Sequence, residues 1–329
     1  MKGTKKISII GAGAIGTALG NILSENGSGE VLLFSIEENV VRSINEQHIN
    51  ARYFPGHHLH SELRATADVS QIKGSSVIFL AIPSVALLDY LNSIRTNIPE
   101  NAVLVNLAKG FGCEESTVVE CLKKHFTNPI CTLKGPSFAK EIINHIPTGF
   151  TLGHPGGDLV EKVSSLFKGS TIYLDFSEDI QGVEILSILK NIYAIVLGIV
   201  DAQFNSPNLR FLILTRAFRE MMNIMLYFGG KEETLYKYCG YGDFTLTALN
   251  DLSRNRTFGL LIGKGFFTEH VSHELVLEGK TAATIFYEKM ARDTEEGQQF
   301  PIISELYKIF SGKYDISRFV STILELDEP

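Results

Sequence analysis

Residues 7–25 read ISIIGAGAIGTALGNILSE, and this stretch decides the fold that we expect. It opens with a short apolar run at 7–10, passes through glycines and small side chains, and continues as a helix-like segment at 17–25. A strand, a glycine-rich turn and a helix in this order are typical of the first unit of a dinucleotide-binding sheet. The alternative is a glycine-rich turn that binds nothing.

Three glycines of the turn have separate expected roles. Gly11 permits the tight turn, Gly13 lets a pyrophosphate approach the backbone, and Gly16 allows the helix to pack closely on the strand. The phosphates would lie at the N-terminus of the helix, where backbone N–H groups have no partner within the helix. The sequence therefore predicts a dinucleotide site here.

The turn after the second expected strand bears on which dinucleotide is bound. Residues 34–38 read FSIEE, and the next basic residue is Arg42. A 2′-phosphate needs an Arg or Lys fork, whereas a ribose hydroxyl can donate to a carboxylate. We therefore expect NAD as the cofactor, with NADH used in preference to NADPH.

The chain divides into two parts of different character. Up to about residue 180, short apolar runs alternate with helix-like stretches, which predicts a mostly parallel sheet with helices on both faces. The expected strands are 7–10, 31–34, 77–81, 103–106, 130–133, 148–152 and 170–174. Later segments have long apolar periodicity, which predicts helices at 182–203, 208–228, 243–262, 271–291, 301–310 and 315–325. We expect an α/β Rossmann-type domain at 1–180 and an all-α domain at 181–329.

Composition narrows the classes of partner. The net charge of −7 gives no overall basic surface for nucleic acid or an anionic membrane. The apolar run at 183–200 is close to the length of a bilayer span, but a lysine at its middle is costly in a membrane. We expect a buried helix of a soluble protein that binds a small phosphorylated substrate. A homodimer is compatible with the sequence, which does not fix the oligomeric state.

The cysteines and histidines give no evident metal site. The four cysteines show neither Cys-x-x-Cys spacing nor a His partner at ligand spacing. The cluster His57-His58-x-His60 lacks a fourth ligand. We expect no metal, and reduced thiols in a cytoplasmic protein.

A polar pair interrupts the apolar run at 183–200. Lys190 and Asn191 lie at its middle. An unpaired amine in apolar surroundings has a lowered pKa and can exchange protons near neutral pH. The alternative is that the pair meets solvent at a domain edge.

A second polar group lies in residues 242–255, GDFTLTALNDLSRN. On one continuous helix a polar stripe would lie opposite an apolar one, with Asp243, Thr247, Asn250 and Arg254 facing away from Phe244, Leu246, Leu249 and Leu252. The polar stripe either faces solvent or lines a cleft, where Arg254 could hold a phosphate by two hydrogen bonds.

Five stretches of the chain carry a resemblance to a known family: GAGAIGTAL at 11–19, NARYFPG at 50–56, GPSFAKE at 135–141, GVEILSILKNIYAI at 182–195 and LSRNRTFG at 252–259. Together they resemble the bacterial-type NAD(P)-dependent glycerol-3-phosphate dehydrogenase family. Other dehydrogenases with this type of sheet share only the first stretch. Lys134 and Ile15 depart from the residues that are usual there.

The resemblance implies hydride transfer between dihydroxyacetone phosphate and sn-glycerol 3-phosphate. It implies that Lys190 gives and takes the proton, with Lys109 and Asp243 beside the reacting atoms. The expected substrate contacts are Lys109, Gly135, Ser137, Lys190, Asn191, Asp243, Thr247, Ser253, Arg254 and Asn255. The expected cofactor contacts are Gly11, Gly13, Ala14, Ile15, Gly16, Phe34, Lys109, Ala139, Arg254, Val276 and Glu278.

Three other functions stay open. One is a related dehydrogenase for another phosphorylated or phosphonate hydroxy compound, and a second is a ketopantoate-type or hydroxy-acid reductase. The third is a regulator that binds NADH without turnover, although such a protein has no reason to keep Lys109, Lys190 and Asp243 together.

Overall fold

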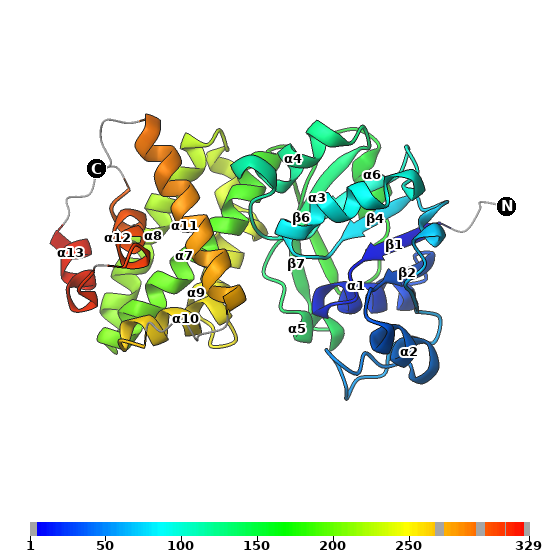
Figure 1. Ribbon diagram of the computed structural model, residues 1–329, viewed down its shortest axis with the longest axis horizontal. Helices are drawn as coiled ribbons and strands as arrows, with labels where there is room; N and C mark the ends of the chain where they lie inside the picture. The colour runs from blue at the N-terminus through cyan, green and yellow to red at the C-terminus, as the bar shows by residue number, and fades with distance from the viewer. Residues whose placement is uncertain (1–4, 267–272, 294–299, 313, 326–329) are drawn as a thin grey trace. The chain divides into compact units, whose positions relative to one another are not determined.

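The computed structural model describes residues 5–266, 273–293, 300–312 and 314–325, without the side chains of 273–278 and 293. Within it the chain forms two compact units, Met1–Glu184 (unit 1) and Ile185–Pro329 (unit 2). Unit 1 runs from blue to green in Figure 1 and unit 2 from green to red.

Unit 1 is built on an eight-stranded sheet in the order β3-β2-β1-β4-β5-β6-β7-β8. All described pairings are parallel except β6 with β7. The strands are β1 (Lys6–Ile10), β2 (Glu30–Phe34), β3 (Arg64–Thr66), β4 (Val77–Leu80), β5 (Val103–Asn106), β6 (Ile130–Lys134), β7 (Thr148–Gly153) and β8 (Ile172–Ser177). The mostly parallel sheet of the sequence prediction is confirmed. The strand β3 was not predicted.

Helices cover both faces of this sheet, because side chains alternate along each strand. In β1, Ile7 and Ile9 belong to the core that includes residues of α1, α2, α5 and α6, whereas Ile10 belongs to the core with α3 and α4. The helices of unit 1 are α1 (Ala14–Glu25), α2 (Glu38–Gln47), α3 (Ser84–Ser93), α4 (Val118–His125), α5 (Ala139–Ile143) and α6 (Leu159–Ser164), with short turns η1 (Val69–Ile72), η2 (Arg95–Asn97) and η3 (Cys113–Glu115). Figure 1 shows α3 and α4 on one side of the strands and α1, α2 and α5 on the other.

Two of the four cysteines are joined. Cys113, in η3, and Cys121, in α4, form a disulfide with their Cα atoms 5.5 Å apart. The prediction of reduced thiols is therefore wrong for this pair. The statement that no histidine stands at ligand spacing is also wrong, since His125 follows Cys121 by one helical turn. The spacing of eight residues does not show that the segment with Cys113 folds back against the helix with Cys121.

All secondary-structure elements among the described residues of unit 2 are helices, as predicted. Its elements are α7 (Ile180–Gln203), which begins in unit 1, α8 (Pro207–Tyr227), η4 (Glu232–Tyr236), η5 (Tyr238–Gly242), α9 (Asp243–Leu249), α10 (Arg254–Gly263), α11 (His273–Asp293), α12 (Pro301–Phe310), η6 (Ile316–Arg318) and α13 (Phe319–Glu325). The single helix expected at 243–262 is two helices, because Asn250 is extended and ends α9. The first residues of the helix expected at 271–291 lie outside the described residues.

The helix α7 is long and apolar enough to cross a membrane by length and composition. However, 94% of its most apolar window is buried inside the protein. A core helix passes the same test of length and hydropathy, so the burial favours the expected core helix over a membrane span.

A buried carboxyl group joins three helices of unit 2. Glu220 of α8 accepts hydrogen bonds from the Tyr193 hydroxyl of α7 (2.9 Å) and from the backbone N–H groups of Ile302 and Ile303 (2.8 Å each). These amides belong to the first turn of α12, where they lack partners within the helix. Burial raises the pKa of Glu220 to about 7, against the opposing effect of these donors.

The raised pKa of Glu220 predicts that the protein loses stability as the pH rises from about 4.5 to 7. In that window the folded state keeps a proton that the unfolded chain, with its usual value of 4.5, has lost. The contribution is about 3 kcal/mol, since one pKa unit corresponds to about 1.4 kcal/mol. The free energy of unfolding, measured by urea unfolding at several pH values in this window, should fall with rising pH in the wild type. In Glu220→Gln it should fall less. The same pH dependence of the unfolding free energy in both proteins would show that folding does not raise the pKa of Glu220.

Candidate active site

The glycine turn between β1 and α1 has the geometry that its sequence requires. Gly11 has a φ of 109°, and a Cβ there would lie 2.6 Å from the carbonyl oxygen of Ala81. A Cβ at Gly16 would lie 2.0 Å from the carbonyl oxygen of Gly11. At Gly13 it would meet no described atom within 4 Å. The turn therefore leaves open space at the N-terminus of α1, which fits a pyrophosphate.

Asn50 braces this turn from another part of the chain. Its amide donates to the carbonyl oxygen of Ala12 (2.9 Å) and to the hydroxyl of Thr17 (2.8 Å). Thr17 also donates to Ala12 (3.2 Å), and the Asn50 side chain is fully buried. Asn50 was not among the predicted site residues, and its place in the NARYFPG stretch was the available signal.

A cation lies at the turn after β2. Arg52 forms an ion pair with Glu37, which occupies the N-cap position of α2 without a side-chain capping hydrogen bond. The sequence analysis did not predict this guanidinium at the turn, because Arg52 lies 15 positions after Glu37 in the chain. Glu37 is therefore not the isolated negative charge on which the expected preference for NADH rests. Phe34, an expected cofactor contact, is only 2% exposed and packs into the core that includes residues of α3 and α4.

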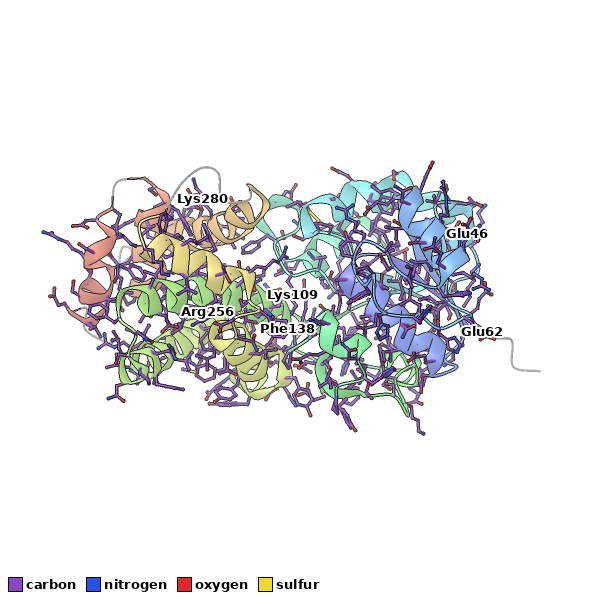
Figure 2. The ribbon with its side chains drawn as sticks, turned by 90° about the horizontal axis from the view of Figure 1, so that it is seen from below. Glu46, Glu62, Lys109, Phe138, Arg256 and Lys280 are labelled. Carbon is purple, nitrogen blue, oxygen red and sulfur yellow. A yellow bond between two sulfur atoms is a disulfide. The ribbon has the colours of Figure 1, made fainter. Side chains whose placement is uncertain are left out.

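Three expected substrate residues of unit 1 meet at one carbonyl group. Lys109, in the loop after β5, donates from Nζ to the carbonyl oxygen of Gly135 (3.3 Å), and Ser137 donates to the same oxygen (2.8 Å). Gly135 must be glycine, since a Cβ would lie 2.4 Å from the carbonyl oxygen of Gly149. Figure 2 labels Lys109 together with Phe138, which directly precedes α5 and the expected cofactor contact Ala139.

A buried ion pair stands behind Lys109. Lys134, at the end of β6, is fully buried, and its Nζ lies 3.1 Å from Glu184 Oε1. The same amine donates to the carbonyl oxygens of Asn106 (3.3 Å) and Ala108. Glu184 also accepts from Asn106 (2.9 Å). Lys134 thus holds the backbone directly before Lys109, a role that its departure from the family pattern did not reveal.

The amine of Lys190 is buried and paired. It contacts the carboxylate of Asp243 in an ion pair and donates to the hydroxyl of Thr247 (3.0 Å). Lys190 is 4% exposed and Asp243 is 1% exposed. The expected unpaired amine is therefore wrong in one respect, because it has a carboxylate partner 53 residues away. The alternative in which Lys190 meets solvent is wrong as well, whereas Asn191 is partly buried.

The expected polar stripe does not exist as one surface, because the helix breaks. Asp243 and Thr247 lie on α9 and are buried, whereas Arg254 begins α10 and is exposed. Ser253 caps α10 by accepting from the N–H of Arg256 (3.3 Å), which gives this expected substrate residue a structural role. Two members of the expected apolar stripe are exposed instead, Leu249 by 36% and Leu252 by 61%.

Glycines hold α10 tightly against α7. A Cβ at Gly259 would lie 2.0 Å from the carbonyl oxygen of Ile195, and one at Gly198 would lie 2.2 Å from that of Arg256. The side chain of Arg256, labelled in Figure 2, also binds Asp201 of α7 (2.6 Å). The start of α10, with Arg254 and Asn255, is therefore fixed relative to the helix that carries Lys190.

Two family models match the chain in succession. The model for the N-terminus of NAD-dependent glycerol-3-phosphate dehydrogenase matches residues 6–157, and the model for its C-terminus matches residues 179–321. The chain belongs to the NAD-dependent glycerol-3-phosphate dehydrogenase family.

Individual members of the family resemble the whole chain. An NAD(P)+ glycerol-3-phosphate dehydrogenase of Halothermothrix orenii is 33% identical over 92% of this chain and 90% of its own length. One of Methanothermobacter thermautotrophicus is 32% identical over 97% of each chain. A crystal structure of glycerol-3-phosphate dehydrogenase from Coxiella burnetii superimposes with a TM-score of 0.89 at 28% identity, covering 98% of this chain and 99% of that one.

Reductases of the ketopantoate type share the fold more distantly. A probable 2-dehydropantoate 2-reductase from Bacillus subtilis has a TM-score of 0.58 at 13% identity, over 93% of this chain and 99% of its own. That likeness shows a common fold alone. The family membership therefore favours the dehydrogenase over this rival.

The expected cofactor contacts of this family member are only partly described. Ala14 and Ile15 form the first turn of α1, beside the open space at Gly13. Val276 and Glu278 lie on α11 in a stretch whose side chains are outside the described residues. The cofactor and substrate contacts that the sequence analysis expects therefore stay predictions.

Proposed function

We propose that this family member interconverts dihydroxyacetone phosphate and sn-glycerol 3-phosphate with a nicotinamide cofactor. The observation that carries the proposal is the buried cluster of Lys190, Asp243 and Thr247. A buried amine that is held in one place by an acid and a hydroxyl is suited to exchange a proton with a substrate oxygen.

Lys190 has the proton-transfer role in this proposal. When the ketone is reduced, its Nζ gives a proton to the carbonyl oxygen, and when the alcohol is oxidised it takes the proton back. Asp243 and Thr247 fix the position of Nζ, so that little reorganisation is needed at the moment of transfer. The nicotinamide, when bound, supplies or accepts the hydride.

The N-terminus of α10 is the proposed phosphate site. Its first-turn N–H groups carry partial positive charge, and the exposed Arg254 adds a planar guanidinium there. Asn255 follows directly and can donate a further hydrogen bond. Phosphate binding at this point would orient the carbonyl group of the substrate.

Unit 1 supplies the proposed dinucleotide site and a second polar group. The open space at Gly13 and the start of α1 accept the pyrophosphate. Lys109 and Ser137, which share the Gly135 carbonyl oxygen, present an ammonium and a hydroxyl for the polar end of the substrate.

The function is tested by following NADH oxidation with a panel of ketones. Dihydroxyacetone phosphate should be reduced well, and dihydroxyacetone, which lacks the phosphate, should be a poor substrate. Faster turnover of a different phosphorylated or phosphonate ketone would support a related dehydrogenase instead. Binding of NADH without turnover of any ketone would support the regulator.

Replacing Arg254 by lysine should raise KM for dihydroxyacetone phosphate about tenfold. Lysine keeps the positive charge but loses the planar fork that can hold a phosphate by two hydrogen bonds, and one such bond to a charged group contributes roughly 1.5 kcal/mol or more. Turnover of unphosphorylated dihydroxyacetone is the matched control and should change little. An unchanged KM for the phosphorylated ketone would place the phosphate elsewhere.

The protein should use NADH better than NADPH, although by a modest factor. Glu37 and Glu38 disfavour a 2′-phosphate, whereas Arg52 beside Glu37 offers it a guanidinium. In Arg52→Ala we expect kcat/KM for NADPH to fall about tenfold and that for NADH to change little. Initial rates with both cofactors decide the matter, and a higher kcat/KM with NADPH in the wild type would overturn the preference.

A cytoplasmic location and a homodimer complete the proposal. In a cytoplasm the Cys113–Cys121 disulfide of the structure would be reduced to two thiols, since disulfides are rare in reducing compartments.

A further inference from the structure

Three side chains of unit 1 bring metal-binding atoms together outside the proposed active site. The sulfur atoms of Cys113 and Cys121 and a ring nitrogen of His125 all lie within 4.8 Å of one another. Among the described residues this is the one group of three His, Cys, Asp or Glu side chains that converge in this way. The disulfide within it is drawn in yellow in Figure 2.

The fold of the chain builds this group from a helix and the loop before it. Cys121 and His125 are four residues apart on α4 and therefore project from the same side of the helix. Thr117 and Glu120 fix the start of α4 through a capping box.

The loop is folded onto the same side of α4, which brings Cys113 to the other two groups. Phe111 pairs with Thr117 in an isolated β-bridge, and the N–H of Gly112 donates to the carbonyl oxygen of Ser116 (2.8 Å). A Cβ at Gly112 would lie 2.8 Å from the Cβ of Cys121, so the loop lies directly against the helix. The three ligands are thus held by local backbone structure.

We propose that reduced Cys113 and Cys121, with His125, form a binding site for one zinc ion. Two thiolates and an imidazole are a ligand set that zinc prefers, with water as the fourth ligand. The ligand atoms of such a site are about 3.3–3.8 Å apart, as follows from Zn–S and Zn–N bond lengths. The Cα separation of 5.5 Å leaves both sulfurs within reach of one ion.

The disulfide and the metal are alternative states of this site. A dithiol reductant gives two electrons and two protons to the Cys113–Cys121 bond, which breaks into two thiols while the reductant becomes a disulfide. Each thiol then releases a proton as it binds the metal, because the thiolate is the ligand. Oxidation therefore excludes the metal, and bound metal protects the thiols.

Cobalt binding to the whole protein tests the proposal. After reduction by a phosphine and removal of oxygen, the protein should bind one Co²⁺ per chain, with the visible bands of tetrahedral cobalt and a near-ultraviolet thiolate charge-transfer band. Zn²⁺ should displace it. The same protein in its disulfide form should show neither band, and this comparison requires no substitution.

Variants separate this site from other metal-binding groups. Cys113→Ser and His125→Ala should each weaken Co²⁺ binding by at least about tenfold, since even outer-shell changes have effects of that size. Cys239→Ser removes a thiol that is not in the group and should leave binding intact. Cobalt held without a thiolate band, or held equally well by the His125→Ala variant, would overturn the proposal.

Discussion

Replacing Lys190 by alanine should lower kcat for dihydroxyacetone phosphate at least about 100-fold, because a positioned general acid typically contributes 10²–10⁴-fold. Lys190 is buried and its Nζ is held by Asp243 and Thr247, so another proton donor cannot simply take its place. The dissociation constant for NADH, measured by fluorescence, should be nearly unchanged. A variant that keeps more than about a tenth of the wild-type kcat would remove Lys190 from this role.

A second variant separates proton transfer from a merely structural ion pair. Arginine at position 190 keeps the positive charge opposite Asp243 but stays protonated at all relevant pH values. If the pair only holds α7 against α9, Lys190→Arg should restore most of the activity. If Lys190 transfers a proton, Lys190→Arg should be about as slow as Lys190→Ala, although its thermal stability recovers.

The sheet of unit 1 could be predicted because its signals are local. Apolar runs of four to six residues separated by turns predict buried parallel strands, and the glycines at 11, 13 and 16 mark the first crossover. The strand β3 was not predicted because Arg64–Thr66 is three residues long and only partly buried. So short a segment has no periodicity to detect.

A feature of the candidate site could be predicted from the sequence only where all the residues that form it lie in one short stretch, as in the glycine turn at 11–16. The break between α9 and α10 does have a local signal, since Ser253 is a typical N-cap residue, but the apolar periodicity through 243–262 obscured it. The pairings of Lys190 with Asp243 and of Arg52 with Glu37 join distant segments. Periodicity carries no information about such pairs, because tertiary packing alone creates them.

The buried pair of Lys134 and Glu184 should be the most sensitive point of unit 1. Both side chains are almost fully buried, and Glu184 also accepts from the Thr132 hydroxyl and from the backbone N–H of Val119 (3.2 Å). A buried charge without its partner is strongly destabilising, whereas an apolar replacement of both partners can be nearly neutral. The pair also fixes the Ala108 carbonyl group, directly before Lys109.

Lys134→Met should therefore lower the free energy of unfolding by about 3–5 kcal/mol, because it leaves the Glu184 carboxylate buried without its ammonium. The double variant Lys134→Met/Glu184→Gln removes both charges and should recover much of this loss in urea unfolding. Activity gives a second readout, since neither variant restores the hydrogen bond from Lys134 to the Ala108 carbonyl oxygen. If Lys134 positions Lys109, the double variant should stay low in kcat/KM although it is stable again. Full activity in the stable double variant would show that Lys134 has a structural role alone.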